Sequence, residues 1–319
     1  MSSKVSDAEF MQLEQIDVNS SLEEFANIYQ PSDFRAAVTQ LRNDGVNKDA
    51  HFPFWDRFGD KFVLRPREVT ILFGSRGSFK STLANYIVAD YMHGGGKVGL
   101  ISYEMDTPYL LTLMVDQFAN STSPTEGYED KCFKLMSERL LLINEMVDRP
   151  HSAIAKVHHM LQQGCKLIVL DCLQRINMPA NDMTLERDFV VELTNLVRAH
   201  NAHLVLVHHS RKGSHADGDN PKPTVDDLKG SGGLADNAQN VCACWSNKKK
   251  KDRQFWLDQG FESREEDEEL LQEPDMLLMV KKQRLGAFEG TIGLWRTPAR
   301  AFHTKGGRPF VYRPELENG

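Results

Sequence analysis

Short apolar runs alternate with longer amphipathic segments along most of the chain, beginning at Val69. The apolar runs are VTILFG, KVGLISYE, RLLLINE, KLIVLD and HLVLVHH, at residues 69–74, 97–104, 139–145, 166–171 and 203–209. Segments with apolar residues at helical spacing lie between them, at residues 80–92, 108–119, 151–163 and 185–200. Runs that are apolar almost throughout are typical of parallel strands buried on both faces. The alternation predicts a mostly parallel sheet flanked by helices, built with right-handed crossovers.

The same pattern divides the chain into an arm and one α/β domain. Residues 1–60 contain SSLEEFANI and PSDFRAAVTQLRNDG, which have helical spacing but too few large apolar residues for a core of their own. We therefore predict a short helical arm or linker at residues 1–60 and a single domain at residues 61–319. Three later strands, NVCACWS, DMLLMVKKQR and GTIGLWR, are expected to extend the sheet at one edge. A basic and then acidic stretch at residues 247–275 is interpreted as a solvated insertion rather than a site.

Composition narrows the class of protein. Apolar residues make up 40% and charged residues 26% of the chain, and no apolar run approaches the ~18 residues that cross a membrane. The N-terminal sequence lacks a secretion signal, and the five cysteines show no paired zinc spacing. We expect buried thiols rather than metal ligands, and a cytoplasmic protein, in the host cytoplasm if it is phage-encoded. The net charge of −7 argues against a nucleic-acid-binding surface over the whole molecule, but it permits a narrow positive channel.

A phosphate-binding loop is the strongest motif. It follows the first strand, opens a helix, and consists of Gly74, Ser75, Arg76, Gly77, Ser78, Phe79, Lys80, Ser81 and Thr82. In such a loop backbone N–H groups and the helix N-terminus bind the phosphates, while a lysine neutralises their charge. Lys80 takes that role and Ser81 offers its hydroxyl to Mg²⁺. Phe79 stands where glycine is usual, so its side chain must point away from the phosphates. The alternative interpretation is a Gly/Ser turn before an ordinary helix.

Polar residues at three strand ends fit nucleotide hydrolysis. Asp171 ends an apolar strand and can hold Mg²⁺ through water. Glu104 ends the second strand, taken to be a neighbour of the loop's strand, and can polarise the attacking water. His208, near the end of the run at 203–209, can bond the γ-phosphate and report hydrolysis to the loop that follows. The alternatives are a solvated glutamate and a structural histidine.

Six motifs in order together resemble the DnaB-type hexameric helicases. They are GSRGSFKST, SYEM, LIVLDCLQ, LVLVHHSRK, DDLKGSGGLADNAQN and VKKQRLGAFEGTIGLW. Within that family the motifs are most similar to the helicase half of T-odd phage primase-helicases and to the mitochondrial Twinkle helicase. The resemblance covers roughly residues 65–300 and implies a RecA-like P-loop NTPase core.

The resemblance also implies roles for single residues. Glu104 matches the catalytic glutamate, Asp171 the Mg²⁺ aspartate and His208 the polar switch residue. Arg284 and Lys282 match the arginine finger and its lysine partner, which would reach the γ-phosphate in the neighbouring subunit and stabilise transition-state charge.

The resemblance further places DNA binding in one loop that lines a central channel. Its matching residues are Lys229, Gly230, Ser231 and Gly232, to which Arg211 and Lys212 could add charge. Backbone N–H groups exposed by glycines, together with lysine side chains, suit the phosphates of one DNA strand.

From these features we expect a homo-oligomer, a hexamer, that uses ATP or a dNTP with Mg²⁺ to translocate 5′ to 3′ on single-stranded DNA. No primase or zinc domain precedes the motor, so a separate primase and polymerase are expected partners. Two alternatives share the same core. One is a RecA- or RadA-like recombination ATPase that forms a filament on DNA. The other is a regulatory or DNA-binding ATPase without unwinding activity.

Overall fold

The computed structural model describes residues 30–51, 53, 61–178, 183–210, 220–228 and 234–314. The chain divides into two units, residues 1–48 and 49–319. In the first unit the 3-10 turn η2 (Pro31–Phe34) leads directly into helix α3 (Arg35–Asp44). Pro31 at the first position of the turn suits such a start. Gly45 ends the helix with a φ of 74°, a conformation that glycine adopts at little cost.

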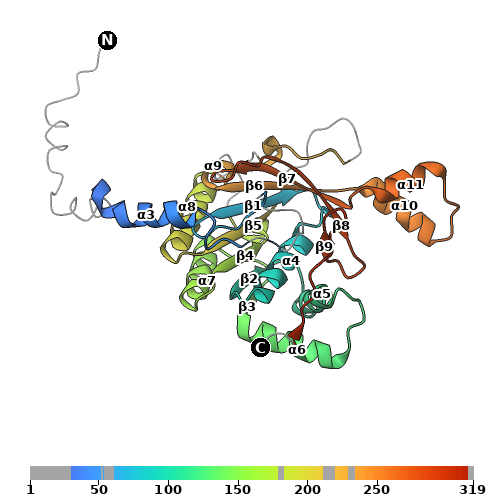
Figure 1. Cartoon of the computed structure of the whole chain (residues 1–319), viewed down its shortest axis with the longest axis horizontal. Coiled ribbons are helices and arrows are strands. Elements are labelled where there is room, and N and C mark those ends of the chain that lie inside the picture. Colours follow the sequence, from blue (N-terminus) through green and yellow to red (C-terminus); the bar gives the residue numbers. More distant parts are fainter. Residues whose placement is uncertain are drawn as a thin grey trace, which may run out of the picture. The chain divides into compact units, whose positions relative to one another are not determined.

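The second unit is built on one large sheet. Within the described residues its strand order is β3-β2-β4-β5-β1-β6-β7-β8-β9 (Figure 1). The strands are β1 (Val69–Gly74), β2 (Val98–Ser102), β3 (Leu140–Asn144), β4 (Leu167–Asp171), β5 (His203–His209), β6 (Asn240–Ser246), β7 (Met276–Gln283), β8 (Gly290–Arg296) and β9 (Phe302–His303). Strands β1 to β6 pair in parallel, and β7, β8 and β9 add an antiparallel edge. The mostly parallel sheet predicted from the sequence is confirmed.

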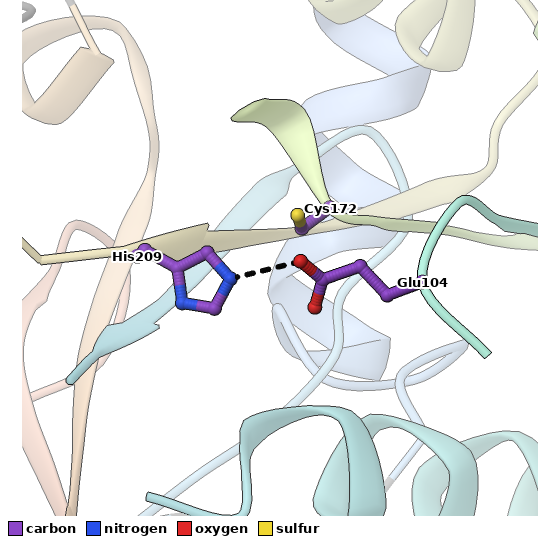
Figure 2. A group of neighbouring side chains, drawn as sticks. All are labelled: Glu104, Cys172 and His209. Carbon is purple, nitrogen blue, oxygen red and sulfur yellow. Dashed lines mark hydrogen bonds and ion pairs between the residues drawn. The ribbon is translucent and has the colours of Figure 1, made fainter. Parts of the chain in front are cut away.

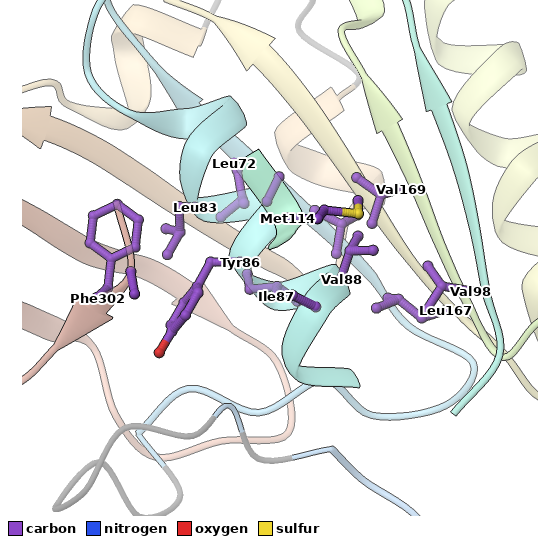
Figure 3. Close-up of a cluster of buried hydrophobic side chains, with 14 of the residues drawn as sticks. Leu72, Leu83, Tyr86, Ile87, Val88, Val98, Met114, Leu167, Val169 and Phe302 are labelled. Atoms are coloured by element: carbon purple, nitrogen blue, oxygen red, sulfur yellow. The ribbon is translucent and has the colours of Figure 1, made fainter. Parts of the chain in front are cut away.

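Helices cover both faces of the parallel strands. They are α4 (Lys80–His93), α5 (Thr107–Ala119), α6 (Glu126–Arg139), α7 (Pro150–Gln162), α8 (Met183–Ala199), α9 (Leu234–Asn237), α10 (Lys248–Asp258) and α11 (Glu265–Gln272), with the 3-10 turns η3 (Leu173–Arg175) and η4 (Val225–Leu228). One core cluster joins the sheet to α4, α5 and α6, and Figure 3 shows part of it. The other joins the opposite face to α7 and α8. Neighbouring residues of a strand alternate between the two clusters, as Ile71 and Leu72 do. Burial on both faces explains the unbroken apolar runs.

The eight strands predicted from the sequence all form, with ends within two residues of the expected ones. Helix α6, helices α10 and α11, and strand β9 were not predicted. The charged insertion at 247–275 folds as the hairpin of α10 and α11, which extends from the sheet (Figure 1). Arg253 bonds Asp267 across the hairpin at 2.6 Å. None of the helices in the described ranges is long and apolar enough to span a bilayer.

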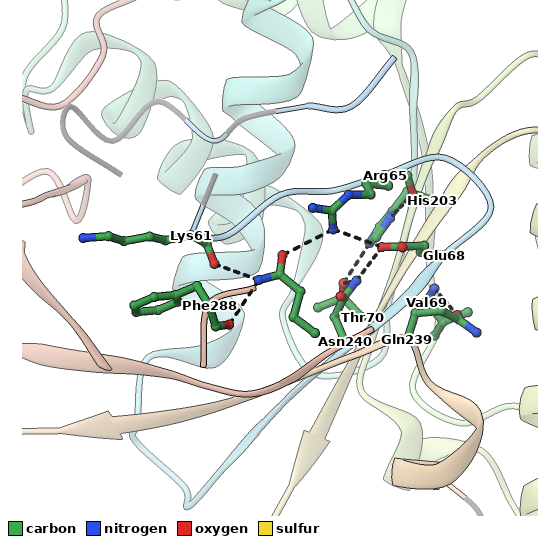
Figure 4. A network of polar contacts seen from close by, with 10 residues as sticks. Lys61, Arg65, Glu68, Val69, Thr70, His203, Gln239, Asn240 and Phe288 are labelled. Carbon is green, nitrogen blue, oxygen red and sulfur yellow. Dashed lines mark hydrogen bonds and ion pairs between the residues drawn. The ribbon is translucent and has the colours of Figure 1, made fainter. Parts of the chain in front are cut away.

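A buried polar network joins the amino ends of the central strands (Figure 4). His203 bonds the Arg65 carbonyl through Nδ1 at 2.6 Å and the Thr70 hydroxyl through Nε2 at 2.9 Å. Asn240 donates to Thr70 and to Glu68, and the Arg65 guanidinium donates to Gln283 of β7 at 3.3 Å. Each buried polar side chain therefore has a partner, which removes much of the cost of its desolvation. The network fixes β1, β5, β6 and β7 at the same end of the sheet.

Candidate nucleotide-binding site

The phosphate-binding loop connects β1 to α4 at the carboxyl end of the sheet. The Ser78 N–H bonds the Ser75 carbonyl at 3.3 Å, which closes the turn. A Cβ at Gly74 would lie 2.2 Å from the Cys244 carbonyl oxygen of β6 and 2.7 Å from the Ser78 hydroxyl, so no larger residue fits there. Gly77, with a φ of 76°, needs the same freedom. Two glycines that the motif requires thus have separate steric reasons.

Phe79 takes the position where glycine is usual and keeps a backbone that favours glycine. Its φ is 63° and its ψ 18°, the left-handed region, which costs a bulky residue energy. Its ring packs against the core cluster on the α4 face. The Arg296 guanidinium, from the end of β8, lies over the ring at 4.6 Å from its centroid. The contacts of the ring are therefore with the core and β8, and β8 supports the loop in a conformation that the side chain alone would disfavour.

Lys80 is almost fully buried at the start of α4. Its ammonium donates to the Ser75 carbonyl at 2.8 Å and approaches the Ser78 hydroxyl at 3.4 Å. Burial lowers the pKa of Lys80, while the charges of Asp171 and Glu104 act in the opposite direction. An ammonium held against the loop by weak backbone acceptors is placed to neutralise phosphate charge.

Asp171 and Ser81 meet beside Lys80 and fit a divalent cation. Asp171 ends β4 with 2% of its surface exposed, and Ser81 hydrogen-bonds its carboxylate. The Oδ1 atom of Asp171 is buried without a hydrogen-bond partner in the described structure. Burial, assisted by the charge of Glu104, raises the pKa of Asp171 to about 6. A carboxylate that lacks a partner for one buried oxygen, next to a hydroxyl, is a donor set that Mg²⁺ prefers.

Glu104 lies in a cluster with His209 and Cys172 (Figure 2). One ligand atom from each of the three residues lies within 4.8 Å of the others. His209 Nε2 is 3.2 Å from Glu104 Oε1, and Arg175 Nε is 3.7 Å from the same oxygen. Although partial burial acts in the opposite direction, hydrogen bonds from His209 and the Cys172 thiol hold the pKa of Glu104 below its usual value. Glu104 is thereby kept ionised and oriented, as a group that polarises water should be.

Two expectations about this cluster need correction. β2 is not a neighbour of β1, because β4 and β5 lie between them; the segment beyond Ser102, where β2 ends, brings Glu104 back to the nucleotide loop. His209, not His208, faces Glu104. Successive side chains of a strand point to opposite faces, so a shift of one residue exchanges them. His208 instead contacts Gln174 and lies 3.9 Å from Glu186.

Arg284 and Lys282 lie at the opposite end of the sheet from Lys80. β7 runs antiparallel to β6, and the Arg284 N–H bonds the Gln239 carbonyl just before β6 begins. The loop glycine Gly74 contacts Cys244, five residues further along β6, a separation of about 16 Å at ~3.3 Å per residue. Lys282 donates to the carbonyl oxygens of Ala235 at 2.7 Å and Asp236 at 3.2 Å. Neither side chain belongs to the nucleotide loop of its own chain.

The six residues predicted to bind DNA, Arg211, Lys212, Lys229, Gly230, Ser231 and Gly232, lie outside the described residues. Helix α9 begins directly after the predicted DNA loop, at Leu234. The remaining loop residues are placed as follows: Arg76 is exposed, and the Thr82 carbonyl accepts a bond from Gln117.

Sequence reasoning missed four residues of this site, namely His209, Cys172, Arg175 and Arg296. Cys172 and Arg175 follow Asp171 within four positions, so proximity to that strand end was a usable signal. Arg296 is more than two hundred residues from Phe79, and nothing in the local pattern connects them. All five cysteines are buried free thiols, as expected.

Comparison with known proteins supports this architecture. Residues 61–215 match the family model of the AAA domain. No curated protein matches the sequence. A solved helicase ATPase domain is similar over 95% of this chain and 99% of its own, with a TM-score of 0.61 and 15% identity. A DnaB-like replicative helicase, described with its interactions with primase, is similar over 93% of this chain and 73% of its own, with a TM-score of 0.63 and 14% identity.

The RadB recombinase is less similar, with a TM-score of 0.49 and 14% identity over 76% of this chain and 92% of its own. The resemblance to DnaB-type proteins is confirmed at the level of the fold, which is the RecA-like fold of helicase ATPase domains.

Proposed function

We propose that this chain, which has the fold of DnaB-like helicase ATPase domains, is a ring-forming ATP-dependent DNA helicase. Lys80 and the loop at 74–82 would bind ATP or a dNTP, and Ser81 and Asp171 would hold Mg²⁺, which supplies charge neutralisation at the phosphates. Glu104, oriented by His209, would polarise the attacking water and pass its proton away from the reacting oxygen. His209 replaces His208 in the switch role, because His209 contacts Glu104.

The observation that carries the proposal is the position of Arg284. Its backbone lies about five strand residues, or ~16 Å, from the level of the nucleotide loop in the same chain. An arginine side chain extends roughly 6–7 Å, about two strand residues, so Arg284 falls well short of its own nucleotide site. An arginine that acts on a γ-phosphate from there must act on the nucleotide of another copy, and a head-to-tail arrangement of copies closes into a ring.

Lys282 supports a link between that interface and DNA. It bonds the first turn of α9, and α9 directly follows the predicted DNA loop. A change at Arg284 would therefore be transmitted through two residues of β7 to the end of the DNA loop. In the first unit, Val38 and Leu41 of α3 are about half exposed, at 46% and 53%. Such an apolar stripe suits a contact with a second copy.

The proposed reaction is translocation 5′ to 3′ on single-stranded DNA by a hexamer. The DnaB-like helicase of the comparison interacts with primase, and we extend this to a separate primase and polymerase acting with the present chain. Hydrolysis passing around the ring would move the DNA loops in turn, and each loop would grip phosphates through Lys229 and backbone N–H groups.

Electron microscopy of the purified chain with ATP and single-stranded DNA, followed by unwinding of a forked duplex, tests the proposal. We expect closed rings, ATP turnover stimulated by DNA, and unwinding that requires a 5′ tail. A monomer whose turnover ignores DNA would contradict it. An open filament that pairs strands would indicate a recombination ATPase, and rings that hydrolyse ATP without unwinding would indicate a regulatory ATPase.

A further inference from the structure

A polar pocket surrounds Arg284 at the amino end of the sheet. Its volume is about 250 Å³, and it is walled by α8, by α9 and by the turn after β7. The side chains that matter here are Thr194, Asn195 and Arg198 of α8, Asp236 and Asn237 of α9, and Arg284 itself. These groups can donate hydrogen bonds from three sides to one bound anion.

The pocket brings a second arginine to Arg284. Arg198 lies in the last turn of α8, where the helix dipole favours a positive charge. Its side chain is exposed, and within the described ranges no ion pair neutralises it. Arg198 and Arg284 contribute +2 and Asp236 contributes −1, so the three charged groups of the lining leave a net charge of +1. Two guanidinium groups over a small polar pocket match the terminal phosphates of a nucleotide.

We propose that Arg198 is a second arginine that acts across the subunit interface: with Arg284 it binds the terminal phosphates of the nucleotide held by the adjacent copy. Thr194, Asn195 and Asn237 supply neutral hydrogen-bond donors around those phosphates. The inference rests on the proposed function, because the phosphates come from a second copy of the chain. It goes beyond the resemblance, which implied only Arg284 and Lys282 at this interface. Since α9 walls the pocket, phosphates bound there also contact the element that ends the predicted DNA loop.

The first experiment measures DNA-stimulated ATP hydrolysis and nucleotide binding in Arg198→Ala. We expect kcat to fall about 10- to 100-fold, because charge stabilisation in the transition state is lost. The dissociation constant of a fluorescent ATP analogue should change less than about two-fold, because the chain's own nucleotide loop is intact. Arg187→Ala is the matched control: Arg187 lies near the start of α8 and pairs with the adjacent Asp188, so its kcat should match that of the wild type. A wild-type kcat in Arg198→Ala would overturn the proposal.

The second experiment separates an action on the adjacent copy from a merely structural role. Arg198→Ala and Lys80→Ala are inactive for different reasons, so in mixed assemblies an intact nucleotide loop can meet an intact Arg198. Up to about a quarter of the interfaces are then complete, and ATP hydrolysis should exceed the sum of the separate proteins. The same mixture made with Arg284→Ala is the reference.

The two mixtures also distinguish this inference from the proposed function. Recovery with Arg284→Ala but not with Arg198→Ala would eliminate the second arginine and leave the ring intact. Failure of both mixtures would contradict the ring itself, and the role of Arg198 with it.

Discussion

The two histidines at opposite ends of β5 show how the two ends of the sheet differ. His203, at the amino end, is 2% exposed and uses both ring nitrogens in hydrogen bonds within the protein. His209, at the carboxyl end, bonds Glu104 through Nε2 and keeps Nδ1 buried without a partner among the described residues. Burial lowers the pKa of both residues, that of His203 to about 4.

The difference separates stability from chemistry. At the amino end the network around His203 binds four strands together, and its groups have partners in the protein. At the carboxyl end Asp171 and His209 each keep an unpartnered buried atom, and unpaired buried polar atoms are costly unless a ligand uses them. The same strand thus carries a structural histidine and, six residues later, a functional one. Only the number of satisfied atoms tells them apart.

The largest effect that could break this comparison comes from the nucleotide loop. Lys80→Ala removes the buried ammonium held at Ser75, and we expect DNA-stimulated kcat to fall at least about 1,000-fold. Phosphate release in the presence of single-stranded DNA measures it. Lys97→Ala removes an exposed lysine that bonds the Gln163 carbonyl and should retain the wild-type rate. Comparable rates in the two variants would show that the carboxyl end does no phosphate chemistry.

The next effect concerns the two adjacent histidines of β5. His209→Ala removes the donor that orients Glu104, so kcat should fall about 100-fold. His208→Ala removes a contact to Gln174 away from Glu104, and kcat should change less than about three-fold. Single-turnover ATP hydrolysis with both variants is the measurement. A larger loss in His208→Ala would return the switch role to His208 and overturn the assignment made from the geometry.

The sequence predicted what depends on burial along a single strand. Runs such as LIVLD at 167–171 are apolar at every position because both faces of the sheet are covered, and a carboxylate at their end then faces the edge where loops converge. Asp171 was found in this way. Glu104 was also found, although its expected neighbourhood was wrong, because strand order depends on crossovers that a periodicity does not encode.

What the sequence could not predict depends on register or on long-range packing. The choice between His208 and His209 is a matter of one residue at a strand end, where both are polar and the pattern gives no preference. Helix α6 was missed because only Cys132, Leu135 and Met136 of its residues are buried, too few for a clear helical period. The bonds of Lys282 to α9 depend on how two elements pack, and neither segment indicates the other.

A smaller effect tests the amino end directly. The folded-state pKa of His203, about 4, lies below its ordinary value of 6.5, so the folded protein favours the neutral ring. The resulting stability is complete above about pH 6.5 and is lost as the pH falls through 4, by about 3 kcal/mol in total. Urea unfolding from pH 7 to 4.5 should show this decline, with a shallower slope in His203→Gln. His159→Gln, which changes an exposed histidine, should keep the wild-type slope; equal slopes in all three proteins would remove His203 as its source.

The smallest effect sharpens the account of the carboxyl end, where a side chain from β8 supports the nucleotide loop. Arg296→Ala uncovers the Phe79 ring while leaving Lys80, Ser81 and Asp171 in place, so the loop should sample its left-handed turn less often. We expect the KM for ATP to rise about three- to five-fold, with kcat within about two-fold of the wild type. Arg300→Ala is the control, because Arg300 lies over Tyr109 rather than over the loop. Phe79→Gly tests the same point from the other side: glycine adopts a φ of 63° without strain, so in that background Arg296→Ala should have no further effect on KM. If the two substitutions instead add, Arg296 acts on the nucleotide independently of Phe79, and β8 does not support the loop.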